Sequence, residues 1–134
     1  MDGSARTTLQ WADGEHIFRL AIGQLRELQD KCSAGPMEIL GRLGTGTWRV
    51  DDIRETIRLG LIGGGKTPTD AHLLTVRYVD ERPLVENVAV AQGVLLVALM
   101  GNPDDKVGKA KAGKTKRKAK TASSSRRSME PAQP

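Results

Sequence analysis

The first regular pattern along the chain is an alternation of apolar and polar residues on both sides of Asp13-Gly14. An Asp-Gly pair is typical of two-residue hairpin turns, because a type I′ turn needs positive φ at both central positions. The pattern predicts a β-hairpin with Trp11 opposite His16 and Leu9 opposite Phe18, and with these four side chains on one face. An isolated hairpin is only marginally stable in water, so other elements must cover this face.

From Ile22 onwards the apolar residues recur every three or four positions, which is the period of amphipathic helices. Glycine and proline residues divide this region into about five short helices. Their predicted starts are Ile22, Pro36, about Val50, Pro68 and Pro83. The last helix is apolar nearly all round its carboxyl half, which predicts that it is the central helix. The fold class is therefore α+β, mainly α, with an N-terminal hairpin packed on about five helices.

Charge and composition divide the chain near residue 103. Residues 1–103 carry 11 Lys and Arg against 13 Asp and Glu, whereas residues 104–134 carry 10 against 3. The second segment has almost no apolar residues, so burial cannot offset the entropy cost of ordering it. We expect one folded domain over residues 7–103, with disordered segments at 1–6 and 104–134.

The basic tail is the main electrostatic feature of the chain. It has no aromatic residue that could stack on bases, which favours weak, salt-sensitive attraction to phosphates or to acidic proteins. A solubilising tail without a partner is the simpler interpretation. The residues that would carry the attraction are Lys114, Lys116, Arg117, Lys118 and Lys120.

The stretch Gly60-Leu61-Ile62-Gly63-Gly64-Gly65-Lys66-Thr67 has the spacing of a phosphate-binding P-loop. A P-loop follows a buried strand, but residues 50–62 have the pattern of an amphipathic helix. Thr67 is better explained as the N-cap of the next helix, with Pro68 at its first position. The match of Gly60, Gly65, Lys66 and Thr67 to the P-loop motif is therefore interpreted as accidental, and no nucleotide cofactor is expected.

Other candidate chemistry is sparse. His16, His72 and Cys32 do not have the spacing of metal ligands, and a single cysteine allows no intrachain disulfide. His16 is expected to pack at the edge of the core, and Cys32 to act as a small hydrophobic residue. The acidic residues Asp51, Asp52 and Glu55 are interpreted as ordinary helix-start acids on a solvated face. We expect no enzyme activity, no metal and no membrane span, and a location in the cytoplasm.

Several segments together resemble a known family. They are Trp11 to Leu20, Ile22 to Gln29, Thr47 to Gly65 and Tyr78 to Leu84. In their amino-acid sequences and their order along the chain, these segments resemble the gene transfer agent family of small phage-tail proteins, over roughly residues 8–101. The members are similar to tail assembly chaperones, and the family is sometimes labelled a tail tube protein.

The resemblance implies a non-enzymatic role in tail assembly. The expected partners are the tape measure protein and the tail tube protein, which a chaperone would bind while the tail forms. A tube component built into the particle is the first alternative, and a nucleic-acid-binding protein acting through the basic tail is the second. Trp48 and Trp11 are the candidate partner-binding residues. The free edge of the hairpin is a candidate for strand addition.

Overall fold

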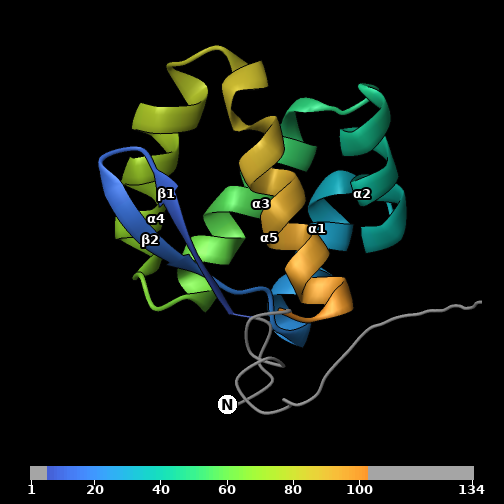
Figure 1. The fold of residues 1–134 in the computed structure, drawn as a ribbon, viewed down its shortest axis with the longest axis horizontal. Helices are drawn as coiled ribbons and strands as arrows, with labels where there is room; N and C mark the ends of the chain where they lie inside the picture. The colour runs from blue at the N-terminus through green and yellow to red at the C-terminus, as the bar shows by residue number, and fades with distance from the viewer. Residues whose placement is uncertain (1–5, 103–134) are drawn as a thin grey trace, which may run out of the picture. The chain divides into compact units, whose positions relative to one another are not determined.

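The computed structural model describes residues 6–102, in which a β-hairpin precedes five α-helices (Figure 1). Two short elements join the last two helices: the π-helix η1 (Val76–Asp80) and the 3-10 helix η2 (Leu84–Asn87). The predicted mainly helical α+β fold is confirmed. The segments predicted to be disordered are residues 1–6 and 104–134. Apart from Arg6, they lie outside the described range. The other elements are β1 (Thr7–Trp11), β2 (Gly14–Phe18), α1 (Ile22–Cys32), α2 (Pro36–Thr45), α3 (Val50–Gly63), α4 (Pro68–Thr75) and α5 (Val88–Met100).

The ends of the helices follow local sequence signals. Pro36 and Pro68 are the first residues of α2 and α4, as predicted. The Thr67 Oγ1 caps α4 by accepting a hydrogen bond from the Asp70 N–H at 3.1 Å. Gly46, with φ 80°, ends α2 in the left-handed conformation that favours glycine.

The hairpin forms, but its predicted register is wrong by two residues. Leu9 lies opposite His16, and Trp11 lies opposite Gly14, so Ala12 and Asp13 are the central turn residues. Ala12 takes the positive φ, at 57°, and Gly14 belongs to β2. A shift of two residues does not change which face a side chain occupies. The predicted apolar face is therefore kept, and Trp11, His16 and Phe18 are all buried.

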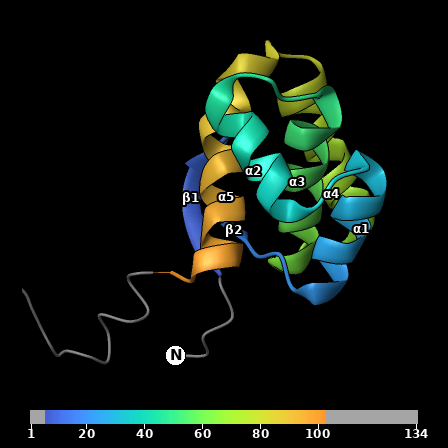
Figure 2. The same cartoon turned by 90° about the vertical axis from the view of Figure 1, so that its right-hand side faces the viewer.

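The innermost helix is α3, not the last helix as predicted. Eight of the fourteen residues of α3 are buried, whereas α5 buries three of thirteen. Helices α1, α4 and α5 and strand β2 pack around α3, and α5 lies beside α2 on the outside (Figure 2). An uncharged sequence predicts burial, but Ala89, Leu96 and Met100 of α5 remain exposed.

Candidate protein-binding surfaces

The glycine-rich stretch that resembles a P-loop lies at the carboxyl end of α3. The N–H groups of Gly64, Gly65 and Lys66 donate hydrogen bonds to the carbonyl groups of Gly60, Ile62 and Leu61, at 2.9–3.0 Å. A P-loop needs such N–H groups to point at phosphate oxygens. In this turn they close the end of the helix, which supports the structural interpretation of the glycines.

Two of these glycines let α3 approach β2 closely. A Cβ atom on Gly63 would lie 1.9 Å from the Arg19 carbonyl oxygen, and one on Gly64 would lie 2.0 Å from the Ile17 carbonyl oxygen. The Arg19 N–H also donates to the Gly60 carbonyl oxygen at 3.0 Å. The end of α3 therefore lies against the backbone of β2, and β1 remains the open strand, which among the described residues pairs as a strand with β2 alone.

Trp11 is a core residue. Its side chain is 7% exposed and packs edge-on against His16, Phe18 and Tyr78. The Trp11 Nε1–H donates to the buried Asn87 Oδ1 at 2.7 Å, and the Asn87 Nδ2 donates to the Tyr78 carbonyl oxygen at 2.9 Å. These bonds connect the hairpin, η1 and η2. A role for Trp11 in partner binding stays a prediction, with little exposed surface to support it.

Trp48 lies in the loop between α2 and α3. It is half-buried and packs against the core cluster, so part of its ring faces solvent. This position allows both a structural contact and an outward contact. Its role as a partner anchor also stays a prediction.

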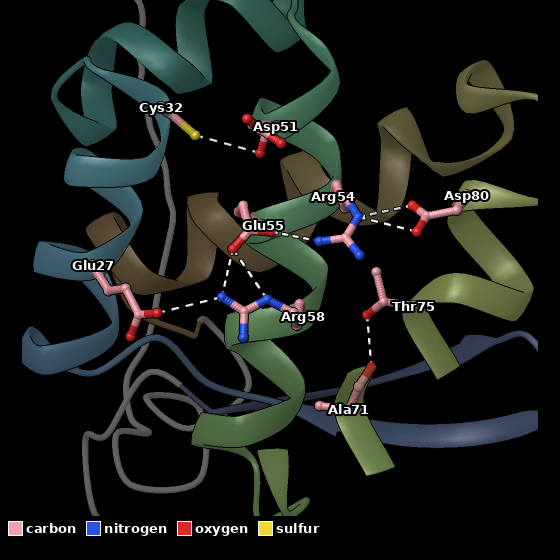
Figure 3. A network of polar contacts seen from close by, with 9 residues as sticks. All are labelled: Glu27, Cys32, Asp51, Arg54, Glu55, Arg58, Ala71, Thr75 and Asp80. Atoms are coloured by element: carbon pink, nitrogen blue, oxygen red, sulfur yellow. Dashed lines mark hydrogen bonds and ion pairs between the residues drawn. The ribbon is translucent and has the colours of Figure 1, made fainter. Parts of the chain in front are cut away.

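The polar side of α3 holds a network of ion pairs that the sequence did not reveal (Figure 3). The Glu55 carboxylate has only 5% of its side chain exposed and accepts hydrogen bonds from Arg54 and Arg58. Arg54 also binds Asp80 of η1 at 2.9 Å, and Arg58 binds Glu27 of α1 at 3.3 Å. The network therefore connects α1, α3 and η1. Burial raises the pKa of Glu55, but the hydrogen bonds and charges of Arg58 and Arg54 outweigh burial and lower it below 4.5.

A second carboxylate, Asp52, is fully buried at the start of α3. It accepts two hydrogen bonds from the Arg42 guanidinium at 3.2 Å and one from the Arg49 N–H at 2.8 Å. Asp51 and Asp52 lie in the first turn of α3, as predicted, but the expected solvated face is wrong for Asp52 and Glu55, which are buried. The arginines at 54 and 58, one before and three after Glu55, were the available signal for a buried ion pair.

Cys32 behaves as the predicted small hydrophobic residue. It is 3% exposed, and its thiol donates to the Asp51 carbonyl oxygen at 3.3 Å. Burial, followed by the negative charge of Asp52, raises the pKa of the Cys32 thiol to about 12. The thiol is therefore protonated at neutral pH, which suits packing rather than nucleophilic chemistry.

Apolar side chains are exposed on most elements of the domain. They are Ile17, Ile22, Met37, Val50, Leu73, Val85, Leu96 and Met100. Two of them lie on one face of α5 together with Ala89, and we call this face the outer stripe: Ala89, Leu96 and Met100. These residues are all exposed, and their steps of seven and four place them on one helix face.

Within residues 6–102, no group of three His, Cys, Asp or Glu side chains is arranged to hold a metal ion. Each helix in that range is too short or too polar to cross a bilayer. The tail residues Lys114, Lys116, Arg117, Lys118 and Lys120 lie outside the described range. The candidate partner-binding surfaces in the described part of the chain are the outer stripe, Trp48 and the edge of β1.

Comparison with known proteins gave one match. A family model described as "Phage tail tube protein, GTA-gp10" matches residues 4–101, which span the hairpin and all five α-helices. The curated proteins and the solved structures each gave no match.

Proposed function

We propose that this protein assists the assembly of a phage-like tail, because the chain belongs to the GTA-gp10 family of phage tail tube proteins. Membership of this family is the observation that supports a role in the tail. The description of the family names a structural protein, not an enzyme. The finer proposal is a tail assembly chaperone. It would bind the tape measure protein, the tube protein or both, and release them as the tail forms.

The observation that supports a chaperone is the exposure of eight large apolar side chains on a small domain. Exposed apolar surface is typical of sites that bind other proteins. These side chains are distributed over seven elements. The buried carboxylates, by contrast, already have arginine partners within the chain. Many small contacts can shield a long apolar partner and still be displaced, which is what a chaperone needs.

Co-expression tests this proposal. The tape measure protein of the same tail system is produced with and without this chain, and the soluble fraction is measured. We expect the tape measure protein to become soluble and to co-purify with the chain. A Trp48→Ala variant tests the loop anchor, and Leu73→Ala provides a second exposed position for comparison. Unchanged solubility would overturn the chaperone proposal.

A tube component is the second candidate function, because the description of the family names the tail tube. The two candidate functions differ in whether the protein is part of the finished particle. Mass spectrometry of purified particles would detect a tube component in stoichiometric amount and would detect a released chaperone only in traces. The stoichiometric result would favour the tube component.

A further inference from the structure

The outer edge of β1 is not protected against strand pairing. Natural edge strands usually carry a charge, a proline or a bulge that prevents another strand from adding. Residues 7–11 contain no charge and no proline, and their pairing with β2 runs through five consecutive residues without a bulge. β2 differs, because it contains Glu15 and its edge lies against the glycine turn that ends α3. The open edge for a further strand is therefore that of β1.

The register shows which backbone groups of β1 point outward. The pair Trp11–Gly14 closes the two-residue turn, so the residues at 11, 9 and 7 bond to β2. The N–H and C=O groups of Thr8 and Gln10 point to the other side, and no hydrogen bond among the described residues uses them. Both side chains are exposed as well. The edge thus offers two donors and two acceptors to an extended chain.

Helix α5 lies along this edge and runs in the opposite direction (Figure 1). At one end the Asn102 Nδ2, just after α5, donates to the Arg6 carbonyl oxygen at 2.8 Å. In the middle a Cβ atom on Gly93 would lie 3.9 Å from the Leu9 Cδ1. The whole of β1 is therefore accompanied by α5.

The outer stripe lies next to the face of α5 that meets β1. Ala89 is four positions before Gly93, and Leu96 and Met100 are three and seven positions after it, so these residues are neighbours on the helix surface. Because β1 already packs on α5, a third strand would continue the hairpin over the stripe. The lengths agree, since Ala89 to Met100 and a five-residue strand each span about 17 Å.

A hollow of about 280 Å³ lies at the turn end of the same edge. Gln10 of β1 and Val90 of α5 line it, together with Tyr78, Arg82 and Glu86. The Arg82 guanidinium is paired with the Glu86 carboxylate at 3.0 Å, so each charge has its partner within the chain. The hollow has room for a side chain of an added strand, and the edge and stripe beside it are uncharged.

Two other occupants fit this surface less well. Pairing the β1 strands of two copies would also bring together the α5 helices that lie against them. Strands in a sheet are about 4.8 Å apart, whereas packed helices need about 8–10 Å. Residues 103–134 of the chain itself have only Val107 and Met129 as large apolar residues, and therefore lack the alternating pattern of a strand. A single extended segment of another protein avoids both difficulties.

We propose that β1 and the outer stripe together bind an extended, uncharged segment of a tail partner, with apolar side chains at alternate positions. The segment adds to β1 as an antiparallel strand. Its backbone bonds to Thr8 and Gln10, and its apolar side chains pack on Leu96 and Met100. This inference rests on the proposed function, because it names how the tail partner is recognised.

A synthetic peptide of about seven residues, in which threonine and valine alternate, tests the proposal with the full-length chain. Two further forms carry N-methyl groups on the threonines or on the valines. In antiparallel addition the threonines face solvent and direct their N–H groups to β1. Fluorescence anisotropy should show saturable binding that N-methylation of the threonines weakens at least tenfold and N-methylation of the valines leaves nearly unchanged.

Variants of the protein locate the surface. Thr8→Pro removes the outward N–H and spares the bonds to β2, because proline is tolerated on the open side of an edge strand. It should weaken binding at least tenfold, whereas Thr8→Val, which keeps the N–H, should not. Leu96→Glu should also weaken binding, and Leu73→Glu, at another exposed leucine on α4, should have no effect. Circular dichroism melts check that each variant is folded.

Several results would overturn the proposal: no binding of the peptide, equal binding of the two methylated forms, equal effects of the two leucine variants, or a dimer in light scattering that Thr8→Pro abolishes. The last result would assign the edge to a second copy. Peptide binding without an effect on tape measure solubility would reject the chaperone role alone. Solubilisation that is insensitive to Thr8→Pro and Leu96→Glu would reject only this binding surface.

Discussion

Helices α3 and α5 differ from the usual rule that charged residues are exposed and apolar residues are buried. α3 carries five charged residues and is the innermost helix, with Asp52 and Glu55 buried. α5 carries none and lies on the outside, with Leu96 and Met100 exposed. The buried carboxylates are compensated by arginines within the chain, whereas nothing in the described residues covers the exposed stripe. Charge in this domain therefore does not prevent burial, and lack of charge does not ensure it.

The largest expected effect is at the end of α3, where backbone meets backbone. Gly64→Ala places a Cβ atom 2.0 Å from the Ile17 carbonyl oxygen, although its φ of −82° suits any residue. Because neither backbone can move away freely, we expect a loss of about 4 kcal/mol in unfolding free energy. Urea denaturation measures it.

Gly23→Ala is the matched control for this substitution. Gly23 lies in α1, and a Cβ atom there would meet nothing within 4 Å. Alanine should stabilise the helix by about 0.5–1 kcal/mol. Equal effects of the two substitutions would show that α3 does not lie against β2 as described.

The next largest effect concerns the buried network of α3. Glu55→Gln removes the charge that faces Arg54 and Arg58, so two arginines lose their buried partner. We expect a loss of about 3 kcal/mol at pH 7. Glu27→Gln, at a half-exposed carboxylate of the same network, should cost less than about 1 kcal/mol. Similar small losses for both would indicate that Glu55 is solvated.

The same network predicts a dependence on pH. The pKa of Glu55 is lowered in the folded protein, so its stabilisation is present above about pH 4.5 and is lost as the pH falls through the folded pKa. The difference in unfolding free energy between the wild type and Glu55→Gln should therefore shrink below pH 4.5. Urea titrations at pH 7, 5, 4 and 3 measure it. A difference that stays constant over this range would contradict the lowered pKa.

The smallest expected effect is on α5. Leu96→Ser should change the unfolding free energy by no more than about 0.5 kcal/mol, because the side chain is 47% exposed. Its neighbour Leu95 is fully buried, and Leu95→Ala should cost about 2–5 kcal/mol. Thermal melts of the two variants compare the faces directly. A large loss in Leu96→Ser would mean that the outer stripe contributes to the core.

Much of the fold could be predicted because its signals are local. Caps and helix breakers act within a few residues, so Pro36, Pro68 and Thr67 marked helix starts correctly. The register of the hairpin was mispredicted, because Ala12 and Asp13, not Asp13 and Gly14, are the central turn residues. Contacts between distant residues were not predictable either. Trp11 bonds to Asn87, 76 positions away, and no local rule includes that bond. The predicted binding residues in the tail lie outside the described range, and the roles of Trp48 and Trp11 in partner binding remain predictions.

The sequence by itself determined the hairpin, four of the five helix starts, the face of the hairpin that is buried and the family, since each depends on short patterns and their order. The start predicted at Pro83 is wrong, because a 3-10 helix occupies Leu84–Asn87 and α5 begins at Val88. Only the tertiary structure decided which helix lies inside. Amphipathic patterns report how much apolar surface a helix has, but not how many neighbours cover it. Glu55 is buried because Arg54 and Arg58 compensate its charge there, and Leu96 is exposed because the elements packed on α5 leave its face uncovered.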